Sequence, residues 1–177
     1  MPGYRILARR RAFEGRALSV DVDRVARPDG VVIERETVRR SGAVAVVAVT
    51  REGLLPLVRQ YRHAADRELL ELPAGLLEPG EEPGACAARE LREESGLIAS
   101  RLDLLTAYYS TAGSSDERVW VYLARGCEEG GERDLDPDEQ LDLVQVRAAE
   151  AVRMARSGEI EDAKTIIGLL LAEPRLD

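Results

Sequence analysis

The chain has little of what disulfide-rich and zinc-binding domains are built from. Among its 177 residues it holds two cysteines, Cys86 and Cys127, and one histidine, His63. Neither cysteine has a cysteine or histidine neighbour at a metal-ligand spacing, which argues against a disulfide framework and against a zinc site. Cysteines used so sparingly favour a reducing compartment. We expect His63 to lie on the surface or at the edge of a substrate, because being the only histidine does not make it catalytic.

Long apolar runs and an excess of positive charge are also missing. No segment approaches the ~20 apolar residues of a membrane-spanning helix, and residues 1–13 are polar and arginine-rich, without the apolar core of a signal peptide. The sequence therefore predicts a cytoplasmic protein with no membrane partner. The 25 basic residues are outnumbered by 33 acidic ones, leaving a formal charge of −8. We therefore expect no nucleic-acid partner, since nonspecific binders neutralise phosphates with excess positive charge.

Clustered or alternating β-branched residues predict strands over most of the chain. Three helices are expected between them, the first bounded by Pro83 and Gly96, which suit the first turn and the C-terminal stop of a helix. Strands interleaved with a few helices predict an α/β fold with a mixed sheet covered by helices. The acidic stretch 128–142 is expected to be a solvated loop. The expected strands are 18–22, 31–38, 43–49, 54–59, 68–72, 102–109, 117–124 and 141–146, and the expected helices are 83–95, 148–156 and 162–172.

The first of these helices carries the residues that point to chemistry. At about 100° per residue, Glu90 and Glu94 lie about 40° apart and Glu93 lies about 60° to the other side of Glu90, so three carboxylates share one face. Their charges repel one another unless cations or arginines neutralise them. Gly75 and Gly80 give the preceding loop the freedom to double back toward this face. The residues expected to pack on the sheet are Ala87, Ala88 and Leu91.

A hard divalent cation suits such a site. Mg²⁺ prefers oxygen ligands and is held by one or two carboxylates together with waters and substrate phosphates. The cation polarises phosphoryl oxygens and lowers the pKa of a bound water, whose proton a nearby carboxylate accepts. The expected cofactor is therefore Mg²⁺, for which Mn²⁺ can substitute, in the hydrolysis of a diphosphate. Cys86 is expected to be a small buried residue, because Mg²⁺ selects oxygen over sulfur.

The spacing of these residues resembles the signature of the Nudix family. In this chain the pattern is glycine, five residues, glutamate, seven residues, then Arg-Glu-aliphatic-x-Glu-Glu-x-Gly-aliphatic over residues 75–97. The resemblance implies an α/β/α sandwich in which Glu90 and Glu94 bind divalent metals. It further implies that the Ala74 carbonyl is a metal ligand, and that Glu93 is a ligand or the catalytic base. The residues to which it gives structural roles are Gly75, Glu81, Arg89 and Gly96, the arginine orienting a glutamate.

Outside the signature, the chain resembles the ADP-ribose pyrophosphatase branch of the family. The likeness lies in segments 58–62, 69–75 and 112–117. It implies hydrolysis of ADP-ribose to AMP and ribose 5-phosphate. It also implies that Arg62 and Glu71 bind substrate, the arginine near the diphosphate.

The loop at residues 110–116 is a further part of this resemblance. Glu117 follows the loop and is implied to reach the metals, which makes it a second candidate for the catalytic base. Ser114 is a candidate for contact with the substrate. This branch usually carries a proline sixteen residues after the last glycine of the signature, which is Gly96 here. In this chain that position is Ala112. The substitution loosens the loop and weakens the assignment of the substrate.

Residues 1–40 hold ten arginines and six acidic residues and more strand than a minimal catalytic core needs. Resemblance implies that they form a dimerisation arm exchanged between subunits of a homodimer, with residues 41–177 as the catalytic domain. Arg39 or Arg40 is a candidate for contact with the nucleoside pocket. Two alternatives stay open: a Nudix enzyme for another substrate, such as GDP-mannose, another sugar nucleotide or an oxidised nucleotide, and a noncatalytic nucleotide sensor. The sequence does not decide between Glu93 and Glu117 as the base.

Overall fold

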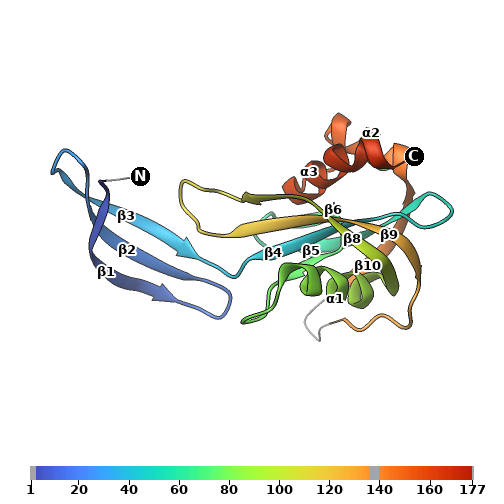
Figure 1. The fold of residues 1–177 in the computed structure, drawn as a ribbon, viewed down its shortest axis with the longest axis horizontal. Helices are drawn as coiled ribbons and strands as arrows, with labels where there is room; N and C mark the ends of the chain where they lie inside the picture. The colour runs from blue at the N-terminus through green and yellow to red at the C-terminus, as the bar shows by residue number, and fades with distance from the viewer. Residues whose placement is uncertain (1–2, 136–139, 177) are drawn as a thin grey trace. The chain divides into compact units, whose positions relative to one another are not determined.

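The chain divides into two compact units in the computed structural model, which describes residues 3–135 and 140–176. The first unit combines the residues up to Gly42 with Tyr108–Arg118. The second combines Ala43–Ala107 with the residues from Val119 onward. Figure 1 labels the helices and strands of both units. The first unit thus contains the expected N-terminal arm and also the loop that carries Glu117.

An antiparallel sheet of three strands, in the order β1, β2, β3, forms the body of the first unit. Its strands are β1 (Arg5–Glu14), β2 (Ser19–Ala26) and β3 (Val32–Arg39). The last two confirm the strands expected at 18–22 and 31–38, whereas the sequence does not predict β1. Arginines interrupt any apolar alternation in β1, and pairing with β2 makes it a strand, from Arg5 opposite Ala26 to Glu14 opposite Ser19.

The second unit holds two further sheets. One sheet, ordered β10, β5, β6, is antiparallel. The other is ordered β7, β4, β9, β8 and is mixed, because β4 pairs antiparallel with β7 and parallel with β9. This pairing confirms the expected mixed sheet. The strands are β4 (Ala43–Ala48), β5 (Leu54–Arg62), β6 (Arg67–Glu71), β7 (Ala74–Leu76), β8 (Leu97–Tyr109), β9 (Arg118–Glu129) and β10 (Leu141–Arg147).

The helices begin and end at residues with local reasons to do so. They are α1 (Pro83–Ser95), α2 (Ala148–Ser157) and α3 (Ala163–Ala172), followed by a short 3₁₀ turn, η1 (Glu173–Arg175). Gly96 ends α1 with φ of 74°, a left-handed conformation that glycine adopts without strain. Asp162 caps α3 by accepting a hydrogen bond from the Thr165 backbone N–H. The expected bounds of α1 are confirmed, and those of α2 and α3 agree to within one residue.

Different helices cover the two faces of the mixed sheet (Figure 1). One hydrophobic cluster contains Val44, Val46 and Ala48 of β4 with Cys86, Ala87 and Leu91 of α1. Side chains alternate along a strand, so Val47 lies on the other face, where α3 packs closely. A Cβ atom added to Gly168 of α3 would lie 2.7 Å from Leu72 Cδ1 and 3.1 Å from Val47 Cγ2. The order helix, sheet, helix confirms the expected sandwich.

Some expectations about loops and packing differ from the structure. Residues 74–76, expected within a loop, form β7 because they pair with the distant strand β4. The stretch 128–142 is only partly a loop, since β9 continues to Glu129 and β10 begins at Leu141, while residues 136–139 lie outside the described residues. Ala88 is exposed and does not pack on the sheet, because it lies about 100° around the helix from buried Ala87.

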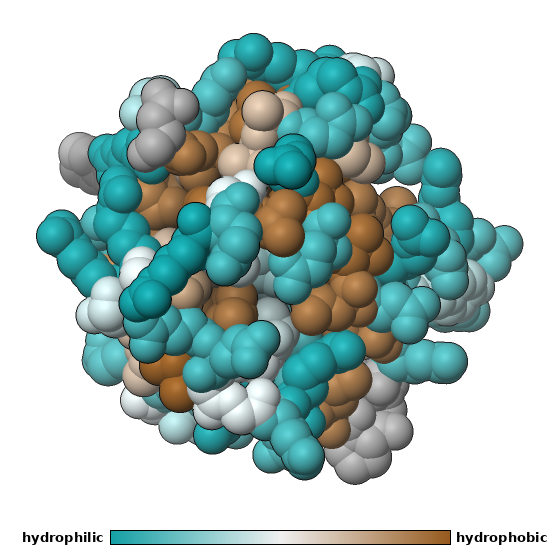
Figure 2. Space-filling model, turned by 90° about the vertical axis from the view of Figure 1, so that its right-hand side faces the viewer, coloured by the Kyte–Doolittle hydropathy of each residue, from teal (hydrophilic) through white to brown (hydrophobic). Residues whose placement is uncertain are grey.

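Apolar side chains also reach the surface. Figure 2 shows hydrophobic patches between hydrophilic side chains on the face that it draws. Scattered exposed apolar residues are ordinary, but several belong to the first unit. Those with large exposed side chains there are Tyr4, Ile6, Leu7, Phe13, Val31, Val32 and Tyr109. Within residues 3–135 and 140–176, no helix has the length and apolar character needed to cross a membrane.

Candidate active site

Two glutamates of α1 face the short strand β7. Glu94 Oε2 accepts a hydrogen bond of 2.9 Å from the Ala74 backbone N–H. A Cβ atom added to Gly75 would lie 1.9 Å from Glu90 Oε1, so only glycine leaves space for that carboxylate. Gly75 is therefore required by close approach rather than by a turn. The structure brings Ala74, Gly75, Glu90 and Glu94 together, as the sequence predicts.

Both of these carboxylates are buried, and arginines supply part of their counter-charge. Glu90 is 7% exposed and Glu94 is 2% exposed. Arg89 Nη1 donates to Glu90 Oε1 at 2.7 Å and to Glu93 Oε2 at 3.0 Å. Arg92 Nη2 donates to the other Glu93 oxygen at 2.9 Å. A buried charge is costly unless it is paired, and these contacts reduce that cost on one side of the cluster.

The rest of the Arg89 guanidinium holds the loop before α1. Its Nε and Nη2 donate to the two carboxylate oxygens of Glu81, each at 3.0 Å, and Nη2 also donates to the Leu76 carbonyl oxygen. The hydrogen bond from Arg89, assisted by the Glu78 backbone N–H, lowers the pKa of Glu81 to about 2. The same pair raises the pKa of Arg89 above its usual value. Arg89 and Glu81 therefore join the loop to the helix and orient Glu90 and Glu93.

Cys86 lies on the same side of α1 but belongs to the core. Its side chain is fully buried in the cluster between α1 and β4. Burial raises the pKa of the Cys86 thiol to about 12, so the neutral thiol is the stable form at neutral pH. The expectation of a small buried residue is confirmed.

Three of the four glutamates around α1, Glu81, Glu90 and Glu93, form the described ion pairs with Arg89 and Arg92. The described part of the chain contains no ready-made group of three or more acidic, cysteine or histidine side chains around a metal position. The fit to a divalent cation therefore rests on Glu90 and Glu94 beside the backbone of Ala74. One or two carboxylates with backbone or substrate oxygens are the donor set that Mg²⁺ prefers, so the residues present suit that ion.

A second charged group joins β5, β6 and α3. Arg62 donates from Nε and Nη2 to the two oxygens of Glu71, each at 2.6 Å, and Lys164 Nζ donates to Glu71 and Asp162. Burial of Glu71 acts to raise its pKa, but Arg62 and Lys164 together outweigh it, and the pKa lies below the usual value. Glu71 is 1% exposed, so its visible role is to hold the more exposed Arg62.

The sequence does not predict that Lys164 and Asp162 belong to this charged group. Thr165 Oγ1 donates to Asp162 at 2.6 Å and accepts a hydrogen bond of 2.8 Å from the Leu72 backbone N–H. The start of α3 is thereby tied to the segment that leads into Ala74. The only local signal was Asp162 as a helix cap three residues before Thr165, and it gives no hint of a partner 93 residues away.

The predicted residues Ser114 and Glu117 lie in the first unit. The Ser114 carbonyl oxygen accepts from the Val38 backbone N–H at 2.8 Å, and the side chain of Ser114 is exposed. The Glu117 side chain is 14% exposed and lies 3.5 Å from Arg40 Nε. The structure thus places both residues next to the end of β3.

His63 is exposed, as expected. Its neighbour Tyr61 is also exposed, and the Tyr61 hydroxyl donates to Asp66. Trp120 and Tyr122 alternate on β9, and both are partly buried against the hydrophobic cluster beneath α1.

A hollow of about 530 Å³ lies away from the glutamate cluster, beside α2 and η1. Two of its arginines already have acidic partners, Arg153 with Glu150 and Glu159, and Arg156 with Glu173. Its lining includes two glutamates, Glu52 and Glu173, and Glu173 is the one that pairs with Arg156. The hollow therefore does not offer the side-by-side carboxylates that α1 presents.

Comparison with known proteins agrees with this geometry. Residues 39–167 match the family model of the NUDIX domain. The chain is 42% identical over 160 residues to the ADP-ribose pyrophosphatase of Bacillus subtilis (strain 168), covering 90% of this chain and 86% of the relative. It is 45% identical over 150 residues to the ADP-ribose pyrophosphatase of Mycobacterium tuberculosis (strain ATCC 25618 / H37Rv), covering 84% and 72%.

Two other similarities widen the comparison. The chain is 38% identical over 158 residues to the methanol dehydrogenase activator of Bacillus methanolicus, covering 89% of this chain and 85% of the relative. The crystal structure of an ADP compounds hydrolase superposes with a TM-score of 0.86 at 23% identity, covering 99% and 95% of the two chains. At that identity the structural match speaks for the fold alone.

Proposed function

The chain belongs to the Nudix family, and from that premise we propose that it hydrolyses the diphosphate bond of ADP-ribose to AMP and ribose 5-phosphate. The observation that carries the proposal is the pair of buried glutamates, Glu90 and Glu94, held against the Ala74–Gly75 backbone. The reaction class, cleavage of a nucleoside diphosphate compound, follows from the family. The choice of ADP-ribose is supported by the two relatives of that name at 42% and 45% identity.

The proposed metal site consists of Glu90, Glu94 and the Ala74 carbonyl oxygen, with Glu93 as a further ligand or the base. Nudix hydrolases need divalent metal ions, and Mg²⁺ is proposed for this chain, with Mn²⁺ as a substitute. Such an ion, when bound, neutralises phosphate charge and makes a bound water more acidic. Glu90 and Glu94 are fixed for this role by burial and by the Ala74 N–H.

Two glutamates are proposed as alternative bases. Glu93 is half-buried, and arginines contact both of its oxygens, so these contacts must loosen before it accepts a proton. Glu117 contacts Arg40 at a longer distance of 3.5 Å. Assaying Glu93→Gln beside Glu117→Gln separates them, because loss of the base removes the low-pH limb of the pH–rate profile, in which the rate rises as the base loses its proton.

Substrate binding is proposed for Arg62, Glu71 and Ser114. A guanidinium pairs well with a diphosphate because its donors match the phosphate oxygens. Glu71 takes two hydrogen bonds from Arg62, so we assign it the task of fixing the arginine in one orientation. Ser114 offers an exposed hydroxyl. Removal of Arg62 should raise KM more than it lowers kcat.

A homodimer formed through the N-terminal arm is part of the same proposal. A sheet of three strands buries little apolar area by itself, and the arm exposes Tyr4, Ile6 and Phe13 to 55%, 58% and 55%. A second copy is the proposed cover for these side chains. A monomer in analytical ultracentrifugation at micromolar concentration would contradict the dimer. A cytoplasmic location is also proposed, supported by cysteines that are both unpaired.

The decisive experiment is a substrate panel. ADP-ribose, GDP-mannose, another sugar nucleotide and an oxidised nucleoside triphosphate are assayed with Mg²⁺ or Mn²⁺, and products are identified by phosphorus NMR. We expect ADP-ribose to be cleaved with the highest kcat/KM and to yield AMP and ribose 5-phosphate. A higher kcat/KM for another compound would overturn the choice of substrate, and no cleavage in any assay would overturn the proposed activity.

A further inference from the structure

The loop that carries Glu117 is bonded to the end of β3. Val38 N–H donates to the Ser114 carbonyl oxygen at 2.8 Å, and Asp116 N–H donates to the Val38 carbonyl oxygen at 3.3 Å. Val38 and Ser115 form an isolated parallel bridge. All of these residues belong to the first unit. The N-terminal sheet therefore supplies backbone partners to a loop that lies more than 70 residues later in the chain.

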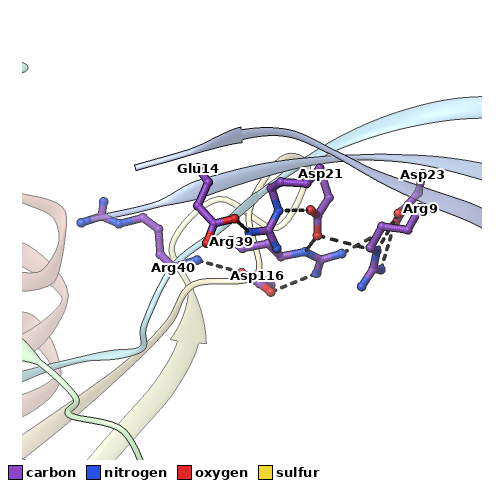
Figure 3. A network of polar contacts seen from close by, with 8 residues as sticks. Arg9, Glu14, Asp21, Asp23, Arg39, Arg40 and Asp116 are labelled. Atoms are coloured by element: carbon purple, nitrogen blue, oxygen red, sulfur yellow. Dashed lines mark hydrogen bonds and ion pairs between the residues drawn. The ribbon is translucent and has the colours of Figure 1, made fainter. Parts of the chain in front are cut away.

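Side chains strengthen this attachment (Figure 3). Asp116 Oδ2 accepts from Arg39 Nη1 at 2.9 Å, and its Oδ1 accepts from the Arg40 backbone N–H at 3.3 Å. Arg39 is itself fixed, because its Nε donates to Asp21 at 3.1 Å and its Nη2 lies 3.5 Å from Asp23. Asp21 and Asp23 are 2% and 5% exposed. Arg39 thus connects two buried aspartates of β2 to the one aspartate of the loop.

Glu117 follows Asp116 directly and shares this environment. Its backbone N–H donates to Ser115 Oγ at 3.1 Å, and its carbonyl oxygen accepts from the Ser110 N–H at 3.1 Å. Its carboxylate lies 3.5 Å from Arg40 Nε. Because one planar peptide bond joins the two, a movement of the Asp116 backbone also moves Glu117.

We propose that Asp116 and Arg39 are positioning residues that hold Glu117 in place for the reaction. This inference rests on the proposed function and on the choice of Glu117 as the base. The N-terminal sheet would then support the catalytic loop of its own chain, in addition to forming the proposed dimer. The loop needs such a support because its own residues are small and polar, and a misplacement of about 1 Å can cost about a hundredfold in rate.

The first test compares two aspartates that are both paired with arginines. Asp116→Ala should lower kcat for ADP-ribose by about tenfold and change KM by a smaller factor, because the base is displaced while Arg62, outside the loop, still binds the substrate. Asp103→Ala is the matched control. Asp103 accepts hydrogen bonds from Arg101 and Arg125 on the second unit's strands, and its removal should leave kcat unchanged. Equal effects of the two variants would overturn the proposal.

The second test asks whether Asp116 acts through Glu117. In a Glu117→Gln background, adding Asp116→Ala should not lower kcat any further. A further tenfold loss would show an effect independent of Glu117 and would overturn the positioning role. Full activity of Glu117→Gln alone would also overturn it, while leaving ADP-ribose hydrolysis intact. If the wild-type chain cleaves no member of the panel, the proposed function fails and the positioning role fails with it.

Hydrogen exchange and conservative variants separate positioning from misfolding. Asp116→Ala should speed amide exchange in residues 110–117 and at Val38, without change in α1 or α3. Asp116→Asn keeps an oxygen for the Arg40 N–H, and Arg39→Lys keeps the charge but not the forked donors. Both should retain more of the wild-type kcat than Asp116→Ala. Unchanged exchange in all three variants would overturn the proposal even if kcat fell.

Discussion

Two clusters of acids, one in each unit, differ in their ratio of acids to arginines. In the cluster of the N-terminal sheet, the buried Asp21 and Asp23 contact three arginines, Arg9, Arg11 and Arg39. In the cluster around α1, three glutamates, Glu81, Glu90 and Glu93, share two arginines, Arg89 and Arg92, in the ion pairs described. The buried acids of the sheet cluster thus have more arginine partners per carboxylate than the glutamates of the helix cluster have in these pairs.

The difference separates a structural cluster from one that suits a cation. Where each acid has an arginine, the ion pairs hold strands and loop together and no further ion is needed. Where buried carboxylates share one helix face, as those of Glu90 and Glu94 do, the folded chain carries repulsion that a bound cation removes. Activity should therefore depend chiefly on the helix cluster, and stability on the sheet cluster.

The largest expected effect is the loss of turnover when the helix cluster loses a charge. Glu94→Gln and Glu90→Gln should each lower kcat by at least ~10²-fold, the scale of metal and acid–base contributions. In EDTA their Tm should stay within a few degrees of the wild type, because an amide removes like-charge repulsion and its oxygen can still accept a hydrogen bond, from the Ala74 N–H at position 94 and from Arg89 at position 90. Steady-state assays measure kcat, and thermal unfolding measures Tm. Near wild-type turnover in both variants would remove this cluster from the mechanism.

A smaller loss of activity is expected from crowding the same cluster without changing its charge. In Gly75→Ala the new methyl group would lie 1.9 Å from Glu90 Oε1, so the carboxylate must move, and kcat should fall by about tenfold or more. Gly84→Ala, near the start of α1, is the matched control. Its added Cβ would lie 3.8 Å from the Tyr122 hydroxyl, an ordinary contact. If both variants kept full activity, the approach of Glu90 to β7 would not matter for catalysis.

The sheet cluster should respond in stability. Asp21 accepts hydrogen bonds from Arg11 at 2.6 Å and Arg39 at 3.1 Å, and these bonds hold its pKa below the usual value. Asp21→Asn weakens both and leaves arginines with less counter-charge, so Tm at pH 7 should fall by several degrees. Glu94→Gln, measured beside it in EDTA, should show the smaller change. The reverse order of the two Tm values would contradict the comparison.

How much of these clusters the sequence predicts depends on how local their contacts are. The bounds of α1 follow from Pro83 and Gly96, and the shared face of Glu90 and Glu94 follows from helical geometry alone. The roles predicted for Ala74 and Gly75 depend on the resemblance of residues 75–97 to the Nudix signature. Contacts between distant residues were not predicted: Arg39 with Asp116 spans 77 residues and Lys164 with Glu71 spans 93.

The missed strands have the same physical cause. Residues 5–14 mix arginines with apolar side chains in no regular alternation, and every residue of β1 is exposed. What makes this segment a strand is its ladder with β2 and the pairing of Arg9 with Asp23. Likewise β7 has three residues and exists through its partner β4. Propensity read along the chain cannot supply such partners.

The smallest expected effect concerns Glu81, the acid that lies at the edge of the helix cluster. Arg89 lowers the folded-state pKa of Glu81 to about 2 from the ordinary 4.5. Its ion pair therefore adds stability above about pH 4.5, and that stability is lost as the pH falls toward 2. The difference in unfolding free energy between wild type and Glu81→Gln should be on the order of 1 kcal/mol at pH 7, because solvent screens this pair, and should vanish near pH 2. Urea unfolding in EDTA at both pH values measures this difference. A difference that grew in acid would show that Arg89 stabilises the fold through Glu90 and Glu93 and not through Glu81.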